Sequence, residues 1–341
     1  MNTVVNSQIY PRLPNRVAML CALVIFPLIW MGGLVTTYDA GMAVPDWPNT
    51  YGYNLFLYPV RDWFFGPWDL FVEHGHRLLG SLAGVICIAL VVTAVWKDQR
   101  KWFRWVAVLA LLLVIVQGLL GGARVVMDER LLAKIHGCLG PAFFALVAGI
   151  VTMSSSWWFR VKSNCDDLSP TDSSPSWLGS SLPGLTVVLL VSSYLQLILG
   201  ANLRHVTINS DPVGYQVLVG CHVALAIFIG VWSILICSIA QRKRNQLLGL
   251  SRMGWILALM VLIQILLGIA TWIVKFGVPG ILSPLMESET FTIEEKSFWQ
   301  MNIITGHVAV GSLILATTAC MTLRAWRVKW LVGNTELNKG L

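Results

Sequence analysis

The stretch Gln117-Gly-Leu-Leu-Gly121 decides the fold of this chain, because it recurs inside later apolar segments. It returns as Gln196-Leu-Ile-Leu-Gly200 and as Gln264-Ile-Leu-Leu-Gly268, and Ile29-Trp-Met-Gly-Gly33 occupies the same place without the glutamine. Each copy is followed by a loop and then by a segment with a histidine near its start. The repeat predicts a helical hairpin that is present four times and forms two similar four-helix bundles.

The segments that carry the repeat are long and apolar. Hydrophobic residues make up 56% of the 341 residues and charged residues only 12%, whereas a soluble protein carries about 25% charged residues. A transmembrane helix needs about 20 apolar residues. We therefore expect an all-α integral membrane protein and exclude a soluble enzyme with one large core. Its eight transmembrane helices are expected at residues 17–37, 72–96, 103–123, 132–155, 183–203, 213–240, 253–275 and 299–323.

Basic residues mark alternate loops and both ends of the chain. These regions hold 16 of the 24 Lys and Arg residues, and the longer loops on the opposite side are acidic. The excess of Lys and Arg in cytoplasmic loops predicts that both termini are cytoplasmic. The short N-terminal tail lacks a long transit peptide, so we expect a bacterial inner membrane. The net charge of +7 therefore orients the protein and does not predict binding of nucleic acid.

A stretch rich in Ser, Asp and Pro between residues 154 and 182 divides the chain. It predicts four parts: an N-terminal four-helix half (1–155), a cytoplasmic linker (156–182), a C-terminal four-helix half (183–325) and a cytoplasmic tail (326–341).

Four histidines take equivalent places in the repeat: His76, His136, His222 and His307. An intramembrane histidine is a functional candidate by default, although it can also hydrogen-bond a neighbouring helix. Zinc prefers a compact tetrahedral set that often includes Cys, whereas haem takes one or two axial histidines from facing helices. The pattern favours one bis-histidine haem in each half.

One carboxylate distinguishes the first half. Glu73 lies three residues before His76, on the same helix face. The corresponding positions in the other copies are Ala133, Val219 and Ile304. Such a carboxylate can abstract a proton or orient water, or it can form an interfacial ion pair with Arg77. The difference indicates that the first half performs chemistry while the second holds a permanent cofactor.

Other polar residues lie near the same membrane surface. Arg77, Arg124 and Arg204 are candidates for contacts with haem propionates, or are simply topology anchors. His74 cannot share a helix face with His76, so we expect it at the rim, and we expect His205 in solvent. The first long outer loop has room for an amphipathic helix around residues 63–65.

Two motifs carry a resemblance to a known family: Gly41-Met-Ala-Val-Pro-Asp46-Trp-Pro48 and Glu73-His-Gly-His76-Arg77. With the four-histidine register, they make the whole chain resemble the haem A synthase family. The resemblance implies oxidation of the C8 methyl group of haem O to a formyl group, which gives haem A for cytochrome oxidase. Two successive oxidations through a hydroxymethyl stage and loss of water are then required.

The resemblance also implies roles for single residues. His76 and His136 would hold the substrate haem O, with Glu73 as the catalytic carboxylate, and His222 and His307 would ligate a haem b cofactor. Haem O synthase, an unidentified electron donor and membrane lipid are the implied partners, and the oligomeric state is left open.

The sequence departs from some bacterial members, which carry a cysteine pair in the first outer loop. Residues 36–70 contain no cysteine. A mechanism that needs a disulfide in this loop is therefore excluded for this chain.

Two other classes of function fit part of the pattern. A di-haem electron carrier of the cytochrome b type would use the four histidines but leave Glu73 without a role. A transporter would explain the internal repeat, but its substrate site would lie near the midplane rather than at one surface.

Overall fold

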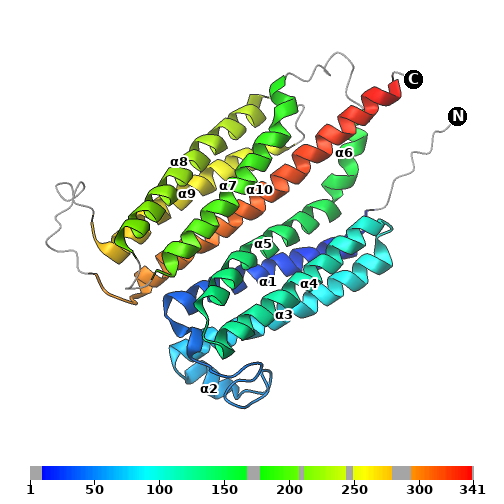
Figure 1. Cartoon of the computed structure of the whole chain (residues 1–341). Coiled ribbons are helices and arrows are strands. Elements are labelled where there is room, and N and C mark those ends of the chain that lie inside the picture. Colours follow the sequence, from blue (N-terminus) through cyan, green and yellow to red (C-terminus); the bar gives the residue numbers. More distant parts are fainter. Residues whose placement is uncertain (1–9, 167–176, 207–210, 243–248, 279–292, 340–341) are drawn as a thin grey trace.

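The computed structural model describes residues 10–166, 177–206, 211–242, 249–278 and 293–339, and the regular elements within these ranges are all helices (Figure 1). Eight of them are long and apolar enough to cross a membrane. They coincide with the predicted spans, so the expectation of an all-α, eight-span membrane protein is confirmed. They are α1 Arg12–Thr37, α3 Trp68–Lys97, α4 Lys101–Val126, α5 Arg130–Ser154, α7 Trp177–Arg204, α8 Pro212–Arg242, α9 Leu250–Phe276 and α10 Phe298–Lys339.

The spanning helices form two bundles of the same plan. In the first, α1 packs on α3 and α5, and α4 packs on the same two helices. In the second, α7 packs on α8 and α10, and α9 packs on the same two helices. The bundles meet mainly where α5 and α1 lie against α10 (Figure 1). Each half predicted from the repeat contains one of these bundles.

Helical structure extends into regions that the sequence pattern assigned to linker and tail. Residues 156–166 of the predicted linker form α6 (Ser156–Asp166), and α10 continues through most of the predicted tail. Three consecutive aromatic residues of α6 explain why it is fixed to the bundles. Arg324, Arg327 and Arg100 lie over the rings of Trp157, Trp158 and Phe159, respectively, and such cation–π contacts join α6 to α10 and to the residue that precedes α4.

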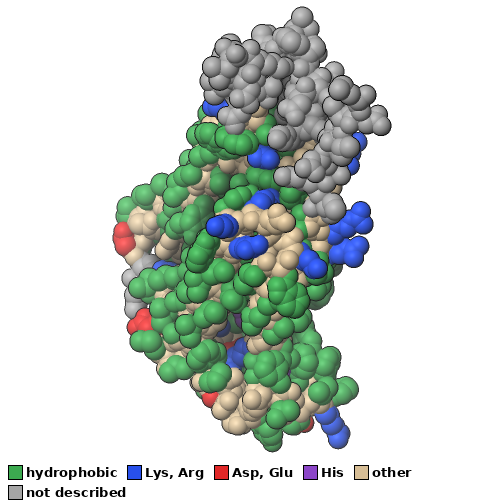
Figure 2. Space-filling view, turned by 90° about the vertical axis from the view of Figure 1, so that its right-hand side faces the viewer, with side chains coloured by type: hydrophobic (Ala, Val, Ile, Leu, Met, Phe, Trp, Pro, Cys, Tyr) green, Lys and Arg blue, Asp and Glu red, His purple; other side chains and the backbone are tan. Residues whose placement is uncertain are grey.

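Apolar cores fill the bundles away from the histidines. Ile25, Leu90 and Phe103 are fully buried in the first bundle, and the sulfur atoms of Cys21 and Cys87 lie 3.6 Å apart between α1 and α3. The outward faces expose large apolar side chains, as expected for helices that contact lipid. Figure 2 shows hydrophobic side chains over most of one face of the molecule.

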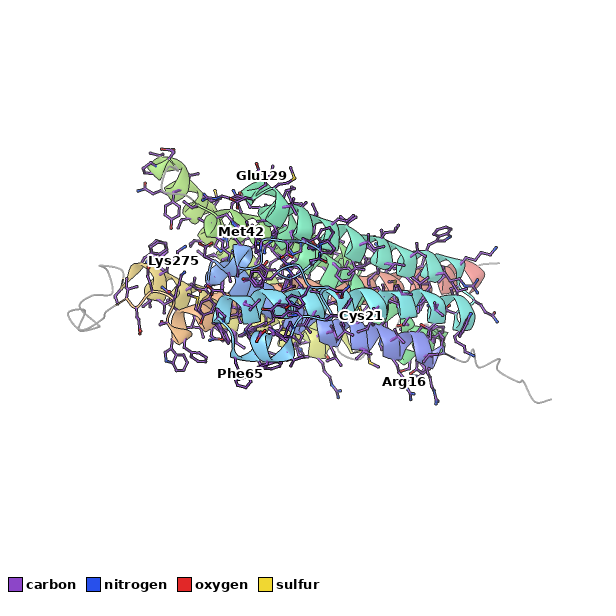
Figure 3. The ribbon with its side chains drawn as sticks, turned by 90° about the horizontal axis from the view of Figure 1, so that it is seen from below. Arg16, Cys21, Met42, Phe65, Glu129 and Lys275 are labelled. Carbon is purple, nitrogen blue, oxygen red and sulfur yellow. The ribbon has the colours of Figure 1, made fainter. Side chains whose placement is uncertain are left out.

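The two ends of the bundles differ. The start of α1, the end of α10 and α6 lie at one end, and α2 (Val60–Phe65) with the short helix η1 (Ala40–Met42) lies at the other (Figure 1). Seen from below, Arg16 lies toward the first end, whereas Met42 and Phe65 lie toward the second (Figure 3). The expected outer-loop helix around residues 63–65 is confirmed as α2.

Candidate functional site

Each repeat histidine lies against a glycine of the preceding helix. A Cβ atom built on that glycine would lie 2.9–3.2 Å from the Cε1 atom of the imidazole, so any larger residue would press on the ring and require it to shift. The four pairs are Gly32 with His76, Gly121 with His136, Gly200 with His222 and Gly268 with His307.

These contacts correct the register of the first repeat. The sequence pattern aligned Ile29–Gly33 with Gln117–Gly121, but the structure aligns residues 28–32 instead. The Nδ1 atom of His76 donates to the carbonyl oxygen of Leu28 (3.2 Å), as Nδ1 of His136 donates to that of Gln117 (3.1 Å). Gly33 has a different role, because a Cβ atom there would lie 2.7 Å from Cγ2 of Thr305 in α10.

The histidines meet in two pairs, one in each bundle. The ring centres of His76 and His136 lie 6.2 Å apart, and those of His222 and His307 lie 6.4 Å apart. Two imidazoles on opposite sides of one metal ion have ring centres about 6 Å apart, since a metal–nitrogen bond is about 2 Å long and the ring centre lies about 1 Å beyond the nitrogen. Both pairs therefore have the spacing of axial ligands to one iron.

The orientation of the first pair also suits metal binding. Because a carbonyl oxygen can only accept, Nδ1 of His76 and of His136 carries the proton, and Nε2 is left as the free ligand atom. Hydrogen bonding of one ring nitrogen to a backbone carbonyl is typical of metal-ligating histidines. Both residues are only half-buried.

Glutamine side chains contact histidines of both pairs, and in the first pair the side-chain amide of Gln117 donates to the carbonyl oxygen of His136 (3.2 Å). The side-chain amide of Gln196 donates to the carbonyl oxygen of His222 (3.0 Å), and Nε2 of Gln264 lies 3.5 Å from Nε2 of His307. Among the described residues, Nδ1 of His222 and of His307 has no hydrogen-bond partner. The backbone of Gln196 and of Gln264 still lies beside these two rings, in the places that correspond to Gln117 in the first pair.

The donor set fits haem better than a bare ion. Within the described residues, no group of three or more His, Cys, Asp and Glu side chains could hold a metal ion. Two histidines are enough only when the metal brings its other ligands with it, as the iron of haem does. The pairs therefore fit bis-histidine haem ligation.

Glu73 and Arg77 fix the outer loop above the first pair. Glu73 is 1% exposed; its Oε2 accepts from the backbone N–H of Val44 (2.8 Å) and its Oε1 from Arg77 (2.8 Å). Arg77 also donates to the carbonyl oxygens of Val44, Asp46 and Asn49 at 2.7–2.8 Å. The alternative of an ion pair with Arg77 is thus realised, but in a buried position rather than in solvent.

The loop held in this way places an aromatic side chain beside the site. A Cβ atom on Gly122 would lie 2.3 Å from two atoms of the Trp47 ring, so the indole lies against the backbone of α4. The preceding residue, Gly121, is the one that contacts His136. The sequence pattern did not identify Trp47 as part of the site, although its Pro-Asp-Trp-Pro motif was noted.

His74 does not lie at the rim, so that expectation is wrong. It is 2% exposed, and its Nδ1 lies 3.0 Å from Oγ1 of Thr50. The rings of Tyr58 and Trp63 lie 5.2 and 5.3 Å from its own. His74 therefore packs the loop onto α3, because the helix face opposite His76 is covered rather than open.

The three candidate arginines differ in their contacts. Arg77 is bound to the loop, and Arg204 donates to the carbonyl oxygen of Gly33 (2.6 Å) and to Oγ1 of Thr37, which ties α7 to α1. Arg124 lies against Gly41, and its charge acts on both His76 and His136. Of the three, Arg124 has the placement that best suits a ligand beside the first pair.

His205, just beyond the end of α7, is half-buried rather than fully solvated. Burial, together with the positive charges of Arg204 and Lys134, lowers the pKa of His205 to about 4. It is therefore neutral at physiological pH.

The chain is similar to a known family over its central part. The family model named COX15-CtaA and described as cytochrome oxidase assembly protein matches residues 67–209. This segment contains Glu73, His76 and His136.

Three curated relatives extend the similarity, and each is named heme A synthase. The protein of Shouchella clausii is 23% identical over 212 residues, which are 60% of this chain and 64% of the relative. That of Lysinibacillus sphaericus is 26% identical over 277 residues (73% and 82%), and that of Symbiobacterium thermophilum is 27% identical over 202 residues (58% and 61%). The match thus spans less than two thirds of the length of two of these relatives.

Proposed function

We propose that the chain is a haem A synthase, because residues 67–209 match the COX15-CtaA family of cytochrome oxidase assembly proteins and the curated relatives are named heme A synthase. In this proposal it is a multi-pass membrane oxidoreductase that converts the C8 methyl group of haem O to a formyl group. One observation carries the proposal: two histidine pairs have the spacing of axial haem ligands, and only the first has a buried carboxylate on the same helix face.

His76 and His136 hold the substrate haem in the first bundle. Their Nε2 atoms are free, while Nδ1 of each ring is anchored on α1 or α4. The anchoring fixes both ring planes, so the substrate can be held in one orientation relative to Glu73. Arg124 is the cation best placed for a propionate group, and Arg77 and Arg204 support it by holding the loop and α1.

Glu73 is the proposed catalytic carboxylate. A carboxylate accepts about four hydrogen bonds, and the structure assigns one to Val44 and one to Arg77. Lone pairs therefore remain for a proton or a water molecule at the substrate. The loop that covers Glu73 also limits access of bulk water, which protects reactive species from side reactions.

His222 and His307 hold a haem b cofactor in the second bundle. When bound, haem b supplies a one-electron carrier close to the substrate site. The chain's own residues here are apolar at the position of Glu73, namely Val219 and Ile304. The second histidine pair therefore holds its haem without an acidic or basic side chain at the position that corresponds to Glu73. As two successive hydroxylations, the oxidation consumes two molecules of O2 together with four electrons and four protons and releases water, so the scheme requires O2 and an external electron donor, with haem O synthase supplying the substrate.

The orientation in a bacterial inner membrane is part of the proposal. The four histidines lie in the first turns of α3, α5, α8 and α10, and the starts of these helices lie at the end opposite the start of α1 and α6 (Figure 1). The positive-inside rule then places the termini in the cytoplasm. Fusions of alkaline phosphatase to either terminus should be inactive, and an active fusion would reverse the orientation.

Haem analysis in a host that lacks haem A tests the activity. The protein is co-produced with a haem O synthase, and the extracted haems are separated. Haem A should appear, and a correctly inserted protein that yields only haem B and haem O would refute the proposal. Glu73→Ala should stop or stall the oxidation while the protein still binds haem. Loss of haem from this variant would make Glu73 a structural residue.

A di-haem electron carrier is not favoured. Such a protein moves charge best when its haems lie on opposite sides of the membrane, whereas all four histidines here lie in the first turns of α3, α5, α8 and α10, which start at the same end of the bundles. It also gives the buried Glu73 no role. A haem content that never changes on incubation with haem O and a reversible quinol-reduced spectrum would favour it.

A further inference from the structure

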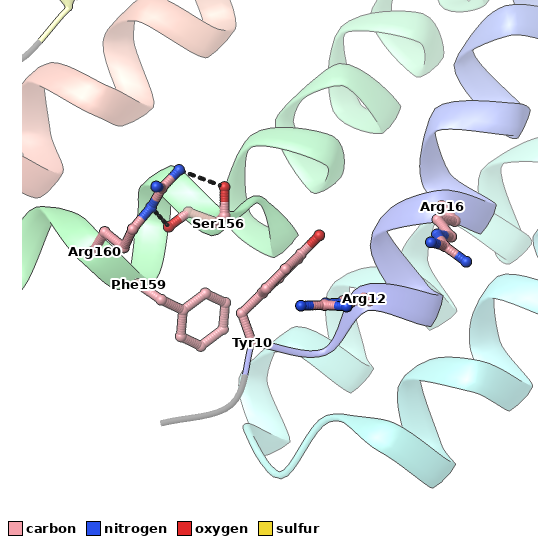
Figure 4. Close-up of a pocket in the computed structure, with 6 residues that line it drawn as sticks. All are labelled: Tyr10, Arg12, Arg16, Ser156, Phe159 and Arg160. Atoms are coloured by element: carbon pink, nitrogen blue, oxygen red, sulfur yellow. Dashed lines mark hydrogen bonds between the residues drawn. The ribbon is translucent and has the colours of Figure 1, made fainter. Parts of the chain in front are cut away.

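A cavity at the end of the molecule that carries the termini lies outside the histidine sites. It has a volume of about 500 Å³ and is lined by Tyr10, Arg12, Arg16, Ser156, Phe159 and Arg160. Figure 4 shows Tyr10 and Phe159 in its centre, with Arg12 and Arg16 from α1 on one side and Arg160 from α6 on the other. Three of its six lining residues are therefore cations, and none is an acid.

The arginines of α1 are not neutralised by the described part of the chain. The ion pairs found there are Arg77 with Glu73 and Arg100 with Asp98, and neither involves the cavity. Arg12 and Arg16 lie four residues apart on one helix face, where like charges destabilise each other. Both side chains are exposed. An anion placed between them would relieve this repulsion.

The start of α1 adds further positive potential. Pro11, which precedes the helix, makes no side-chain hydrogen bond to the first turn. The free backbone N–H groups of a helix start favour an anion, and phosphate groups are frequent ligands of such sites. Helix α1 has 26 residues, so its dipole is fully developed. The positive charges of Arg12 and Arg16 and the free N–H groups at the start of α1 therefore both attract an anion to the same place.

The surface below the cavity is apolar and exposed. Arg12, Arg16, Leu20 and Leu23 follow each other along one face of α1, and the two leucines are 51% and 70% exposed. A ligand with a phosphate at the arginines and hydrocarbon chains along these leucines would match the whole stripe. A free phosphate ion would contact only the two arginines of this stripe and not the leucines.

We propose that this cavity binds the phosphodiester headgroup of an anionic membrane phospholipid. The phosphate lies between the guanidinium groups of Arg12 and Arg16 at the start of α1. The acyl chains run along Leu20 and Leu23 into the bilayer, and Tyr10 and Phe159 flank the glycerol region. This site is independent of the haem sites, since its residues lie at the opposite end of α1 from Gly32.

The test compares lipid selectivity in wild type and in R12Q/R16Q. The full-length protein is reconstituted in phosphatidylcholine vesicles that contain some phosphatidylglycerol, and spin-labelled lipids of each kind report the motionally restricted fraction. Each basic residue near an anionic surface contributes about fivefold to binding, corresponding to about 1 kcal/mol. We expect R12Q/R16Q to lose phosphatidylglycerol selectivity by at least fivefold, with the phosphatidylcholine signal unchanged.

R252Q/K101Q is the matched control. Arg252 and Lys101 are exposed, lie near the starts of α9 and α4 at the same end, and do not line the cavity. This control should retain the selectivity and should show the same helix content by circular dichroism as R12Q/R16Q. An equal loss in both double variants would overturn the proposal in favour of a diffuse basic rim.

Inorganic phosphate separates the two sources of the anion. In pure phosphatidylcholine vesicles, added phosphate should not raise the melting temperature of the wild type, whereas phosphatidylglycerol should raise it. Stabilisation by phosphate that R12Q/R16Q abolishes, without any lipid selectivity, would contradict a lipid site and indicate a soluble phosphate ligand.

Discussion

The two histidine pairs have nearly the same spacing but very different surroundings. The first pair is anchored through Nδ1 on backbone carbonyls and lies beneath a loop fixed by Glu73 and Arg77. The second pair lacks a described partner at Nδ1 and has apolar residues in place of Glu73. One scaffold thus supplies the same ligand geometry twice, and differences outside the ligands decide which copy performs chemistry.

Removing a ligand should have the largest effect and should separate the two sites. His307→Ala or His222→Ala should abolish the haem b signal, because a single remaining imidazole cannot hold the iron on both sides. His76→Ala and His136→Ala should keep that signal and lose binding of added haem O. Pyridine haemochrome spectra and haem extraction measure both. Loss of all haem from every variant would show that the bundles do not bind independently.

Breaking the Glu73–Arg77 contact should open only the first site. In Arg77→Met, Glu73 loses its buried cation and the loop loses three carbonyl contacts, and removing one partner of a buried pair costs about 3–5 kcal/mol. Amide hydrogen exchange at Val44 should rise strongly, since its N–H donates to Glu73.

A matched control for this change lies in the same loop. Arg61 is exposed on α2, so Arg61→Met should alter stability by no more than about 0.5 kcal/mol. Unchanged exchange at Val44 in Arg77→Met would mean that the loop is held by Trp47 and His74 instead.

Adding one methyl group at a glycine should separate effects on the histidine ligand from effects on the helix that carries the glycine. Gly121→Ala places Cβ 3.2 Å from the His136 ring and should tilt the imidazole, at a cost of about 1–3 kcal/mol in haem affinity. Gly118→Ala on the same helix meets no atom within 4 Å and should stabilise α4 by about 0.5–1 kcal/mol. Titration with haem O, followed by its absorption spectrum, measures both. Equal affinities of the two variants for haem O would show that Gly121 is not needed to position the His136 ring.

The smallest expected effect is an acid transition confined to the first outer loop. Burial raises the pKa of Asp46, but hydrogen bonds from the backbone N–H groups of Gly52 and Tyr51 outweigh burial and lower it below 3.8. The carboxylate therefore stabilises the turn at neutral pH, and this contribution is lost as the pH falls through the lowered pKa. Hydrogen exchange at Gly52 should rise only below that pH. Asp46→Asn should show no such transition.

The sequence pattern predicted the helices better than the contacts at the site. The spans and histidine register follow from apolar length and from the repeat, which are local properties. The alignment of Ile29 was off by one residue because Leu28 lacks the glutamine side chain that marks the other copies, yet it uses the same backbone carbonyl.

The contacts of the first outer loop could not be predicted from the sequence for another reason. Trp47 and Thr50 lie far from Gly122 and His74 in the chain, and nothing in their own neighbourhood specifies which helix they meet. Likewise, the sequence favoured a functional carboxylate over an interfacial ion pair with Arg77 for Glu73, and it gave no indication of the partner Val44. A pattern of residue types predicts a face, whereas the identity of the contact across a loop depends on tertiary packing.

Helix α1 belongs to the first bundle but also packs against α10 of the second. Gly32 touches the imidazole of His76, and its neighbour Gly33 touches Thr305 of α10. Helix α10 is synthesised after the four spanning helices of the first bundle. The first bundle therefore reaches its final packing only after α10 has also been inserted into the bilayer.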